Sequence, residues 1–227
     1  MECEILNFCL LVLERYFSGV WKVTSICTDV KAPCGTILFG GNNTYQSALG
    51  TIGLENALQY KARFIPSSSN SKNNIIADRD YNVREIATSS MGSLSVLDIP
   101  IATPNRFAVT LAPQNSNSLI SVDLLSLARR QEYIDESHFD CSEVVRQIIQ
   151  PLDRQQQRVQ TGRGPVLKEI ETISLYTSIN PGEIKAKQRT ATFLMPSTTD
   201  PMAMKMWEVA KGRPIDVRFY DVIYNRI

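Results

Sequence analysis

The chain has 227 residues, 43% of them hydrophobic and 21% charged, a globular composition that suits one large all-β domain. Lys and Arg number 24 against 23 Asp and Glu, a net charge of +1. Without a positive excess, counterion release has no evident source, so a dedicated nucleic-acid-binding protein is disfavoured. No apolar run approaches the roughly 20 residues of a membrane-crossing helix, and we expect no transmembrane span.

The first residues are apolar but do not resemble a targeting signal. The apolar run Ile5–Val12 is short, and Glu2 and Glu4 stand where a signal peptide carries Lys or Arg. We interpret residues 1–14 as an N-terminal arm, either a docking segment or the remnant of a longer precursor. Residues 15–227 are then a single domain.

Most of the chain has the pattern of short strands separated by turn residues. Val20–Ile26 is rich in β-branched and aromatic residues, and Leu58–Ile65 alternates polar and apolar positions as a half-buried strand does. The polar run Pro66–Asn74 is predicted to be a long hairpin loop. Ser142–Ile149 suits either a strand or a short helix, ended by Pro151. Further strands are predicted at Thr36–Phe39, Ile75–Ala77, Val83–Ser89, Ser93–Asp98, Arg106–Leu111, Leu119–Leu127 and Ile215–Tyr224.

The strongest hairpin signal lies in the C-terminal third. Val166–Tyr176 and Ile184–Met195 are two long strand-like runs, joined through Asn180-Pro181-Gly182, a turn-forming triplet. Pro201–Ala210 has helical composition and is predicted to be a short helix. About ten strands with one or two short helices predict an all-β fold, an antiparallel β-barrel in preference to a sandwich or a parallel α/β sheet.

The head of the first strand carries a distinctive glycine and tryptophan. Gly19 allows a close backbone approach, and Trp21 offers a large apolar plane that would cover one end of a barrel. This resembles the Gly-x-Trp motif of lipocalins and related calycin barrels, in which an Arg of the last strand stacks across the Trp. The resemblance implies a lipocalin-like (calycin) β-barrel, with Arg218 as the first candidate for that Arg and Arg226 as the second.

A second aromatic segment lies near the C-terminus. Met202, Met204 and Met206 flank Trp207, a composition that suits an adaptable lid over an apolar ligand or a partner surface, with ordinary core packing as the favoured alternative. The candidate ligand-binding or barrel-closing residues are therefore Gly19, Trp21, Arg218, Trp207 and Met204.

Residues able to carry out acid–base or nucleophilic chemistry are few. His138 is the single histidine, so any Ser-His-Asp or Cys-His arrangement would have to use it. Glu169 and Glu171 should leave the same face of a strand, which suits either acid–base work inside a barrel or, as we favour, a solvated outer face matched by Lys185, Lys187 and Arg189. We predict no catalytic residues and no phosphate-binding loop.

The five cysteines contain no C-x-x-C pair, which disfavours a zinc ribbon, and we predict no metal site. Cys27 and Cys34 flank a turn and are a candidate disulfide. The favoured alternative is two reduced, half-buried thiols.

Several blocks resemble an uncharacterised family of cyanobacteria and plant plastids, a domain of unknown function. They are Arg15–Ser25 (RYFSGVWKVTS), Ala32–Gly41 (APCGTILFGG), Ile76–Asn82 (IADRDYN) and Lys168–Thr172 (KEIET). The resemblance extends over roughly residues 15–224. It implies a chloroplast location with thylakoid association, although no transit peptide is recognisable, and it transfers no functional residues.

Three functions remain open on this basis. The first is a non-enzymatic lipocalin-like binding protein that holds an apolar or amphipathic ligand such as a lipid, carotenoid or tetrapyrrole. The second is a subunit or assembly factor of a photosynthetic membrane complex, acting through protein–protein contacts. The third and least favoured is a chromophore lyase-like enzyme, in which Cys27, Cys34 or Glu169 would act. The sequence specifies no cofactor.

Overall fold

The computed structural model describes residues 17–67, 75–112, 119–152, 165–198 and 200–227. Within these residues the fold is all-β, one antiparallel sheet in the order β3-β2-β1-β10-β9-β8-β7-β6-β5-β4. The strands are β1 Gly19–Lys31, β2 Leu58–Pro66, β3 Ile75–Ala77, β4 Val96–Ala102, β5 Arg106–Leu111, β6 Leu119–Tyr133, β7 His138–Leu152, β8 Val166–Asn180, β9 Glu183–Leu194 and β10 Asp216–Arg226. The helices are α1 Thr36–Phe39, α2 Asn42–Leu49, η3 Leu54–Asn56, α3 Arg79–Met91 and α4 Pro201–Ala210.

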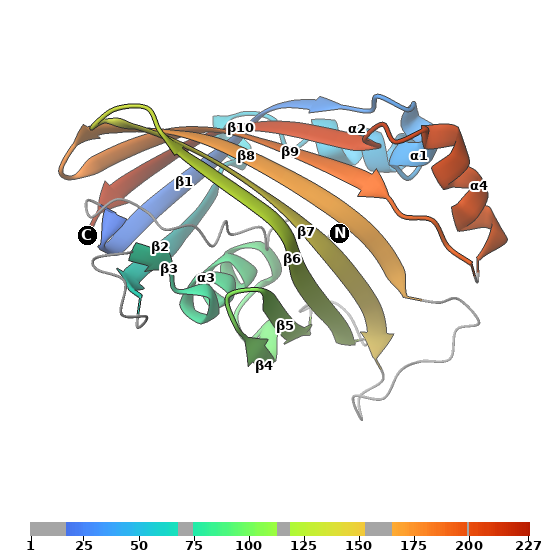
Figure 1. Cartoon of the computed structure of the whole chain (residues 1–227), viewed down its shortest axis with the longest axis horizontal. Helices are drawn as coiled ribbons and strands as arrows, with labels where there is room; N and C mark the ends of the chain where they lie inside the picture. The colour runs from blue at the N-terminus through green and yellow to red at the C-terminus, as the bar shows by residue number, and fades with distance from the viewer. Residues whose placement is uncertain (1–16, 68–74, 113–118, 153–164, 199) are drawn as a thin grey trace.

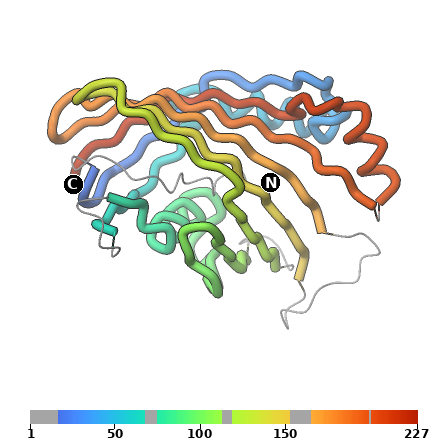
Figure 2. The backbone as a smooth tube through the Cα atoms, viewed as in Figure 1, coloured from blue at the N-terminus to red at the C-terminus, as the bar shows by residue number. Residues whose placement is uncertain are grey.

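The sheet curls into a half-barrel, as Figure 1 shows. Among the described residues β3 and β4 each have a single sheet neighbour, so the predicted closed cylinder is wrong in this respect. Helix α3 lies on the concave side and packs against both β2 and β4, near the two edges of the sheet. The backbone trace in Figure 2 shows the long hairpins β6–β7 and β8–β9 arching over this helix, with α4 at the opposite end from their turns.

The central strands follow the alternation expected of a sheet with one buried face. In β7 the odd-numbered residues from Phe139 to Gln147 are buried, while the even-numbered residues between them are half-buried. Hairpin β8–β9 forms at the predicted triplet, where the side chain of Asn180 accepts a hydrogen bond from the amide of Gly182 at 2.8 Å. Strand β7 includes Pro151, so the prediction that this proline ends the element is wrong. Pro151 pairs only with Ile120 of β6, beyond the end of the β8 pairing, where its missing N–H leaves no ladder bond unmade.

Two segments predicted as strands are helical. The predicted strand Val83–Ser89 lies inside α3, which begins after Asp78, whose side chain accepts a hydrogen bond from the amide of Tyr81 at 3.2 Å. The predicted strand Thr36–Phe39 is the single-turn helix α1. It is bounded by Gly35 and Gly40, whose φ angles of 83° and 119° suit glycine and bend the chain into a helical turn.

The other predicted elements are confirmed in kind. Strands form at the remaining predicted positions, and the ambiguous segment Ser142–Ile149 is part of β7. The hairpin of β2 and β3 is antiparallel, as expected, and α4 has the predicted bounds. The N-terminal arm and most of the loop at Pro66–Asn74 lie outside the described residues. Two buried clusters fill the concave side: an aromatic one at the β1 start and an aliphatic one between α3, β5 and β6.

Candidate functional site

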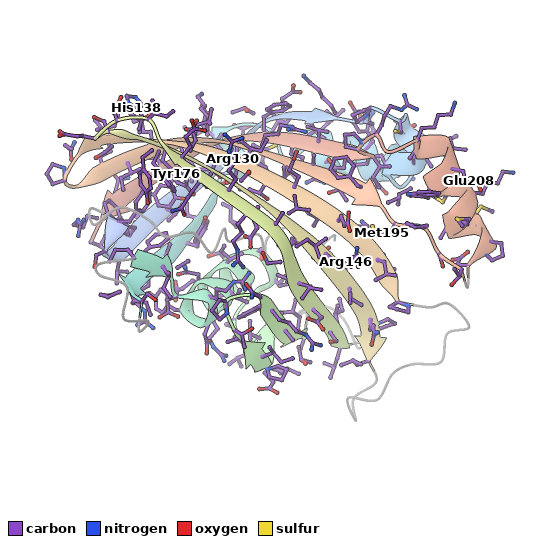
Figure 3. All side chains as sticks on the ribbon, viewed as in Figure 1. Arg130, His138, Arg146, Tyr176, Met195 and Glu208 are labelled. Carbon is purple, nitrogen blue, oxygen red and sulfur yellow. The ribbon has the colours of Figure 1, made fainter. Side chains whose placement is uncertain are left out.

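The candidate site is the concave face of the half-barrel, which has an aromatic end and a polar middle. The aromatic end gathers around Phe17, which is fully buried and lies 5.4 Å from Phe64 of β2 and 5.2 Å from Tyr176 of β8, both between ring centroids. Because one ring contacts both β2 and β8, which are four places apart in the strand order, the sheet must curl. Figure 3 shows Tyr176 beneath the sheet, whereas His138 lies at the hairpin tip. The remaining members are Trp21, Phe139, Tyr60, Tyr220 and Tyr224.

Trp21 is fully buried, and its indole nitrogen donates a hydrogen bond to the carbonyl of Phe17 at 2.7 Å. The guanidinium of Arg226 lies 4.5 Å from the centre of its ring. Arg226 also donates to the carbonyls of Ser18 at 2.8 Å and Pro181 at 3.0 Å. The Gly-x-Trp pattern therefore coincides with a Trp–Arg stack at the start of β1.

Gly19 has a specific role in this stack. Its φ is +117°, and a Cβ at this position would lie 3.2 Å from a guanidinium nitrogen of Arg226. The bare backbone thus leaves room for the arginine that covers Trp21.

The first-ranked arginine, Arg218, does not stack on Trp21, and that assignment is wrong. In the β1–β10 register Trp21 lies opposite Arg226, whereas Arg218 lies opposite Val30 near the other end of the strand. Its guanidinium pairs with Asp216 at 2.9 Å and lies 5.9 Å from the ring centre of Phe39. Sequence reasoning identified the last strand but not the register, which depends on pairing distant in the chain.

A polar band crosses the concave face beside the aromatic end. Two register rows run from β7 through β8 and β9 to β10: Glu143–Thr172–Thr190–Arg218 and Cys141–Ser174–Gln188–Tyr220. Glu143, Thr172 and Ser174 are buried, while Gln188 and Thr190 are half-buried. We define the polar band as Glu143, Thr172, Ser174, Gln188 and Thr190. No sequence signal singled it out, because its five residues are divided among three strands that pair only in the folded sheet.

The carboxylate of the polar band is held by strand β6. Glu143 accepts hydrogen bonds from Arg129 at 2.7 Å and from the hydroxyl of Ser126 at 2.8 Å. A bulge between Ser126 and Ala128 adds one residue to β6, which brings Ser126 and Arg129 to the same carboxylate oxygen. The charge of Glu143 is therefore compensated within the protein, as is that of Arg218 by Asp216.

Tyr60 of β2 is the tyrosine of the aromatic end whose ionisation is most affected by its surroundings. Burial raises the pKa of Tyr60 well above its usual value, and the nearby Tyr224 adds to the shift. The Tyr60 hydroxyl therefore stays neutral up to strongly alkaline pH.

The residues considered for catalysis are engaged in structural contacts. Glu171 pairs with the predicted Arg189 at 3.1 Å on the convex face, whereas Glu169 pairs at 2.7 Å with Arg146 of β7 and not with Lys185 or Lys187. His138 is exposed and contacts Asp135 at 2.8 Å. Hydrogen bonds from the amide of Ser137 first, and then from the His138 side chain, lower the pKa of the Asp135 carboxyl.

Cys27, Cys34 and Cys141 are free thiols, so the candidate Cys27–Cys34 disulfide is not formed. Cys34 instead faces the backbone carbonyl of Pro214 at 3.4 Å, and Cys27 is buried against α2. Over the described part of the chain, no group of three or more His, Cys, Asp and Glu side chains is arranged to hold a metal ion.

Met204 and Trp207 lie on α4, away from the concave face. Only Ala210 of this helix is buried, and Trp207 is exposed. Core packing holds for Met206, which packs against the buried cluster of Ala210, and not for Met202 or Trp207, which are exposed. Figure 3 shows Glu208 of the same helix at the periphery of the molecule.

Comparisons with known proteins place the chain by family only. No curated protein matches the chain. No solved structure matches it either. In the described ranges, no helix has both the length and the apolar character needed to cross a membrane. Residues 14–226 match the family model described as a domain of unknown function (DUF6816), and the chain therefore belongs to this family.

Proposed function

We propose that this protein is a non-enzymatic binding protein that holds an amphipathic molecule on the concave face of its half-barrel. The observation that carries the proposal is the polar band, buried beside an aromatic cluster on the same face. Burying hydroxyl and amide groups is unfavourable unless they form hydrogen bonds, so an inward face normally carries apolar residues. A ligand with a polar head and an apolar body would match both parts of this face.

The chemistry of the polar band favours a neutral head group. The charged residues around it form ion pairs within the protein, Arg129 with Glu143 and Arg218 with Asp216. Hydroxyl and amide side chains that both donate and accept hydrogen bonds make up the rest, Thr172, Ser174, Gln188 and Thr190. Such a surface suits a lipid or carotenoid with hydroxyl or sugar groups better than a tetrapyrrole, whose carboxylates would require cations that are not already paired.

The lipocalin-like character and the plastid setting belong to the same proposal. The Trp21–Arg226 stack is similar to the Trp–Arg contact of calycin barrels and supports a lipocalin-like character, although the sheet here is open. The resemblance of the sequence blocks to a cyanobacterial and plastid family supports a chloroplast location at the thylakoid. Membranes rich in neutral glycolipids and carotenoids would supply ligands of the proposed kind.

The test uses native mass spectrometry of the full chain after incubation with a lipid and pigment extract of thylakoids. We expect one ligand to remain bound, and Thr172→Val to lower its affinity about fivefold to tenfold, since one hydrogen bond is worth about 1 kcal/mol. Thr177→Val on the same strand is the matched control, because Thr177 alternates with the inward Thr172 and Tyr176 and should leave affinity unchanged.

Two outcomes would overturn this proposal. One is a full chain that retains no molecule from the extract. The other is equal ligand retention by the Thr172→Val and Thr177→Val variants when circular dichroism shows both to be folded.

A second candidate function is supported by exposed apolar side chains near the turns of the two long hairpins. Tyr133 and Ile134 on β6–β7, and Leu175 and Ile179 on β8, are exposed. A partner in a photosynthetic membrane complex would cover them. This alternative predicts co-migration with a complex in gently solubilised thylakoids, and migration as a free monomer contradicts it.

The lyase-like alternative receives no comparable support. Glu169 is paired with Arg146 on the convex face, and Cys27 and Cys34 contact backbone carbonyls. No described arrangement joins one of these residues to a general base.

A further inference from the structure

The chain reaches the concave face before β1 begins. Phe17, which precedes this strand, is fully buried, and its carbonyl accepts the hydrogen bond from the indole nitrogen of Trp21. Its ring contacts inward rings of three strands: Phe64 of β2, Tyr176 of β8 and, at 6.1 Å between centroids, Tyr224 of β10. Phe17 therefore lies on the concave side, and the residues before it continue from there.

The residues before Phe17 include an apolar segment, which we define as Ile5–Leu13. Residues 1–16 lie outside the described ranges. Eight of the nine residues of the apolar segment are apolar, so it is stable in water only when another surface covers it. At about 3.3 Å per extended residue, its middle can reach about 26 Å from Phe17. The polar band begins two residues along β8 from Tyr176, about 7 Å away, and lies within this reach.

The inward side chains of β8 are buried although the described helices pack on other strands. Thr172 and Ser174 are 3% and 2% exposed. Among the described helices, α3 packs mainly against β2 and β4, α2 against β1, and α4 against β9. Burying hydroxyl groups is unfavourable without hydrogen bonds, and a peptide backbone supplies both donors and acceptors. A segment of the chain laid across the polar band would meet this requirement.

We propose that the apolar segment docks on the concave face beside Phe17 and covers the polar band until a ligand displaces it. Its apolar side chains extend the aromatic end, and its backbone pairs with the hydroxyls of β8. The segment is favoured over a separate partner because its attachment at Phe17 gives it an effective concentration of about millimolar. Displacement by a ligand rests on the proposed function, whereas docking of the segment does not.

Two native thiols report on this docking. Cys9 lies in the apolar segment, and Cys141 is a buried free thiol of β7 that lies opposite Ser174 of the polar band. Cys141 is two residues along β7 from Phe139 of the aromatic end, a distance of about 7 Å. The proposal predicts that Cys9 lies within cross-linking reach of Cys141 and that the fold shields Cys9 from solvent.

The test is cross-linking of the full chain with a bismaleimide, read by peptide mass spectrometry in a Cys3→Ser background. We expect a Cys9–Cys141 product within one chain, and labelling of Cys9 by a water-soluble maleimide at least about tenfold slower than in the urea-unfolded chain. Leu10→Asp with Leu11→Asp should lower the cross-link yield at least about tenfold. Adjacent side chains of an extended segment point to opposite sides, so one aspartate would be buried.

The matched control adds the same charge outside the concave face. Leu94→Asp with Leu97→Asp replaces two leucines that are already exposed, and should leave the cross-link yield unchanged. Circular dichroism shows whether both double variants are folded.

The displacement of the segment is tested with the lipid and pigment extract of thylakoids. Incubation with the extract should lower the cross-link yield. The Leu10→Asp/Leu11→Asp variant should bind the retained molecule at least about fivefold more tightly, because a site that is free only part of the time binds with proportionally lower affinity. A cross-link that forms in a chain retaining no molecule would refute the proposed function and leave the docking of the segment intact.

Four results contradict the inference. Cys9 is labelled as fast in the folded chain as in urea, or the two folded double variants give equal cross-link yields. The Cys9–Cys141 product joins two chains, which would assign the segment to a second copy. In the fourth, the chain retains a molecule while the cross-link yield stays the same, which excludes displacement.

Discussion

At the scale of single residues, the stack of Arg226 on Trp21 is a contact of the kind that the Gly-x-Trp pattern predicts. The register between β1 and β10 decides which arginine forms it. One guanidinium covers the buried indole and donates hydrogen bonds to two carbonyls, of Ser18 before β1 and of Pro181 in the β8–β9 turn. It thereby ties the starts of β1 and β9 to the end of β10. A single side chain joins three segments that are distant in the sequence.

Arg226→Met keeps the aliphatic stem and removes the charge and the donors. We expect a loss of about 1–3 kcal/mol in the free energy of unfolding, from the cation–π contact and two hydrogen bonds. Urea denaturation followed by circular dichroism measures it. Arg130→Met, at an exposed position of β6, is the control and should change stability by less than about 0.5 kcal/mol. Equal stability of the two variants would contradict the role given to the stack.

Tyr60 gives the fold a predicted sensitivity to alkali. Its pKa in the folded state is raised, chiefly by burial. Above the ordinary tyrosine pKa of about 10 the unfolded chain loses this proton while the folded chain keeps it, so stability falls as the pH rises from there towards the folded-state pKa. Tyr60→Phe should flatten this decline. The comparison is the slope of unfolding free energy against pH in both proteins, and parallel slopes would refute the prediction.

At the scale of elements, α3 protects an edge of the sheet. The side chain of Asn82, fully buried, accepts a hydrogen bond from the backbone N–H of Arg63 at 2.6 Å and donates one to its carbonyl at 3.1 Å. It thus takes the place of a neighbouring strand just beyond the short pairing of β2 with β3. An open sheet edge would otherwise be a template for pairing between molecules.

Asn82→Leu should cost about 1–3 kcal/mol of stability, because the backbone N–H of Arg63 loses its partner and the carbonyl keeps only the bond from the amide of Asp78, at 2.9 Å. It should also increase aggregation. Ser89→Ala on the same helix is the control: it removes an exposed hydrogen bond to the carbonyl of Gln59 and should cost less than about 1 kcal/mol. Thermal unfolding and light scattering give both readouts. A stability loss no greater than that of Ser89→Ala would remove the edge-protecting role of Asn82.

The opposite edge is protected differently. Strand β4 contains Pro100 and two register shifts in its pairing with β5, at Val96/Asp98 and at Asp98/Ile101. Proline lacks the donor that a further strand would use, and the shifts bend the edge. These features make β4 a poor partner for a further strand, as Asn82 does for the part of β2 beyond β3, and the sheet can remain open.

The helix α3 also shows where pattern reading failed and why. Its buried residues are Arg79, Asn82, Val83, Ile86 and Ala87, spaced as one helical face. The helical period was present in the sequence, but two of these five side chains are polar, and hydrophobicity alone hides the stripe. Asn82 is buried because it serves the edge of β2, a requirement that no local pattern contains.

At the scale of the whole molecule, the positions of most strands can be predicted from the sequence. Whether the sheet closes into a barrel cannot. The hairpin at Asn180-Pro181-Gly182, strand Arg106–Leu111 and helix Pro201–Ala210 were all predicted from local residue preferences. The choice between a closed barrel and a half-barrel depends on whether β3 meets β4. A helix between those two strands in the chain occupies that region, as Figure 1 shows.

The sequence by itself therefore determined the all-β class, most strand positions, the Trp21 anchor and the convex position of Glu169 and Glu171. These follow from alternation, turn chemistry and side-chain type, which act over a few residues. Only the tertiary structure decided that Arg226 and not Arg218 meets Trp21, that the polar band assembles, and that α4 is exposed. Each of these depends on the register between strands far apart in the chain or on how completely the fold covers a surface, and a one-residue change of register would turn every side chain to the other face.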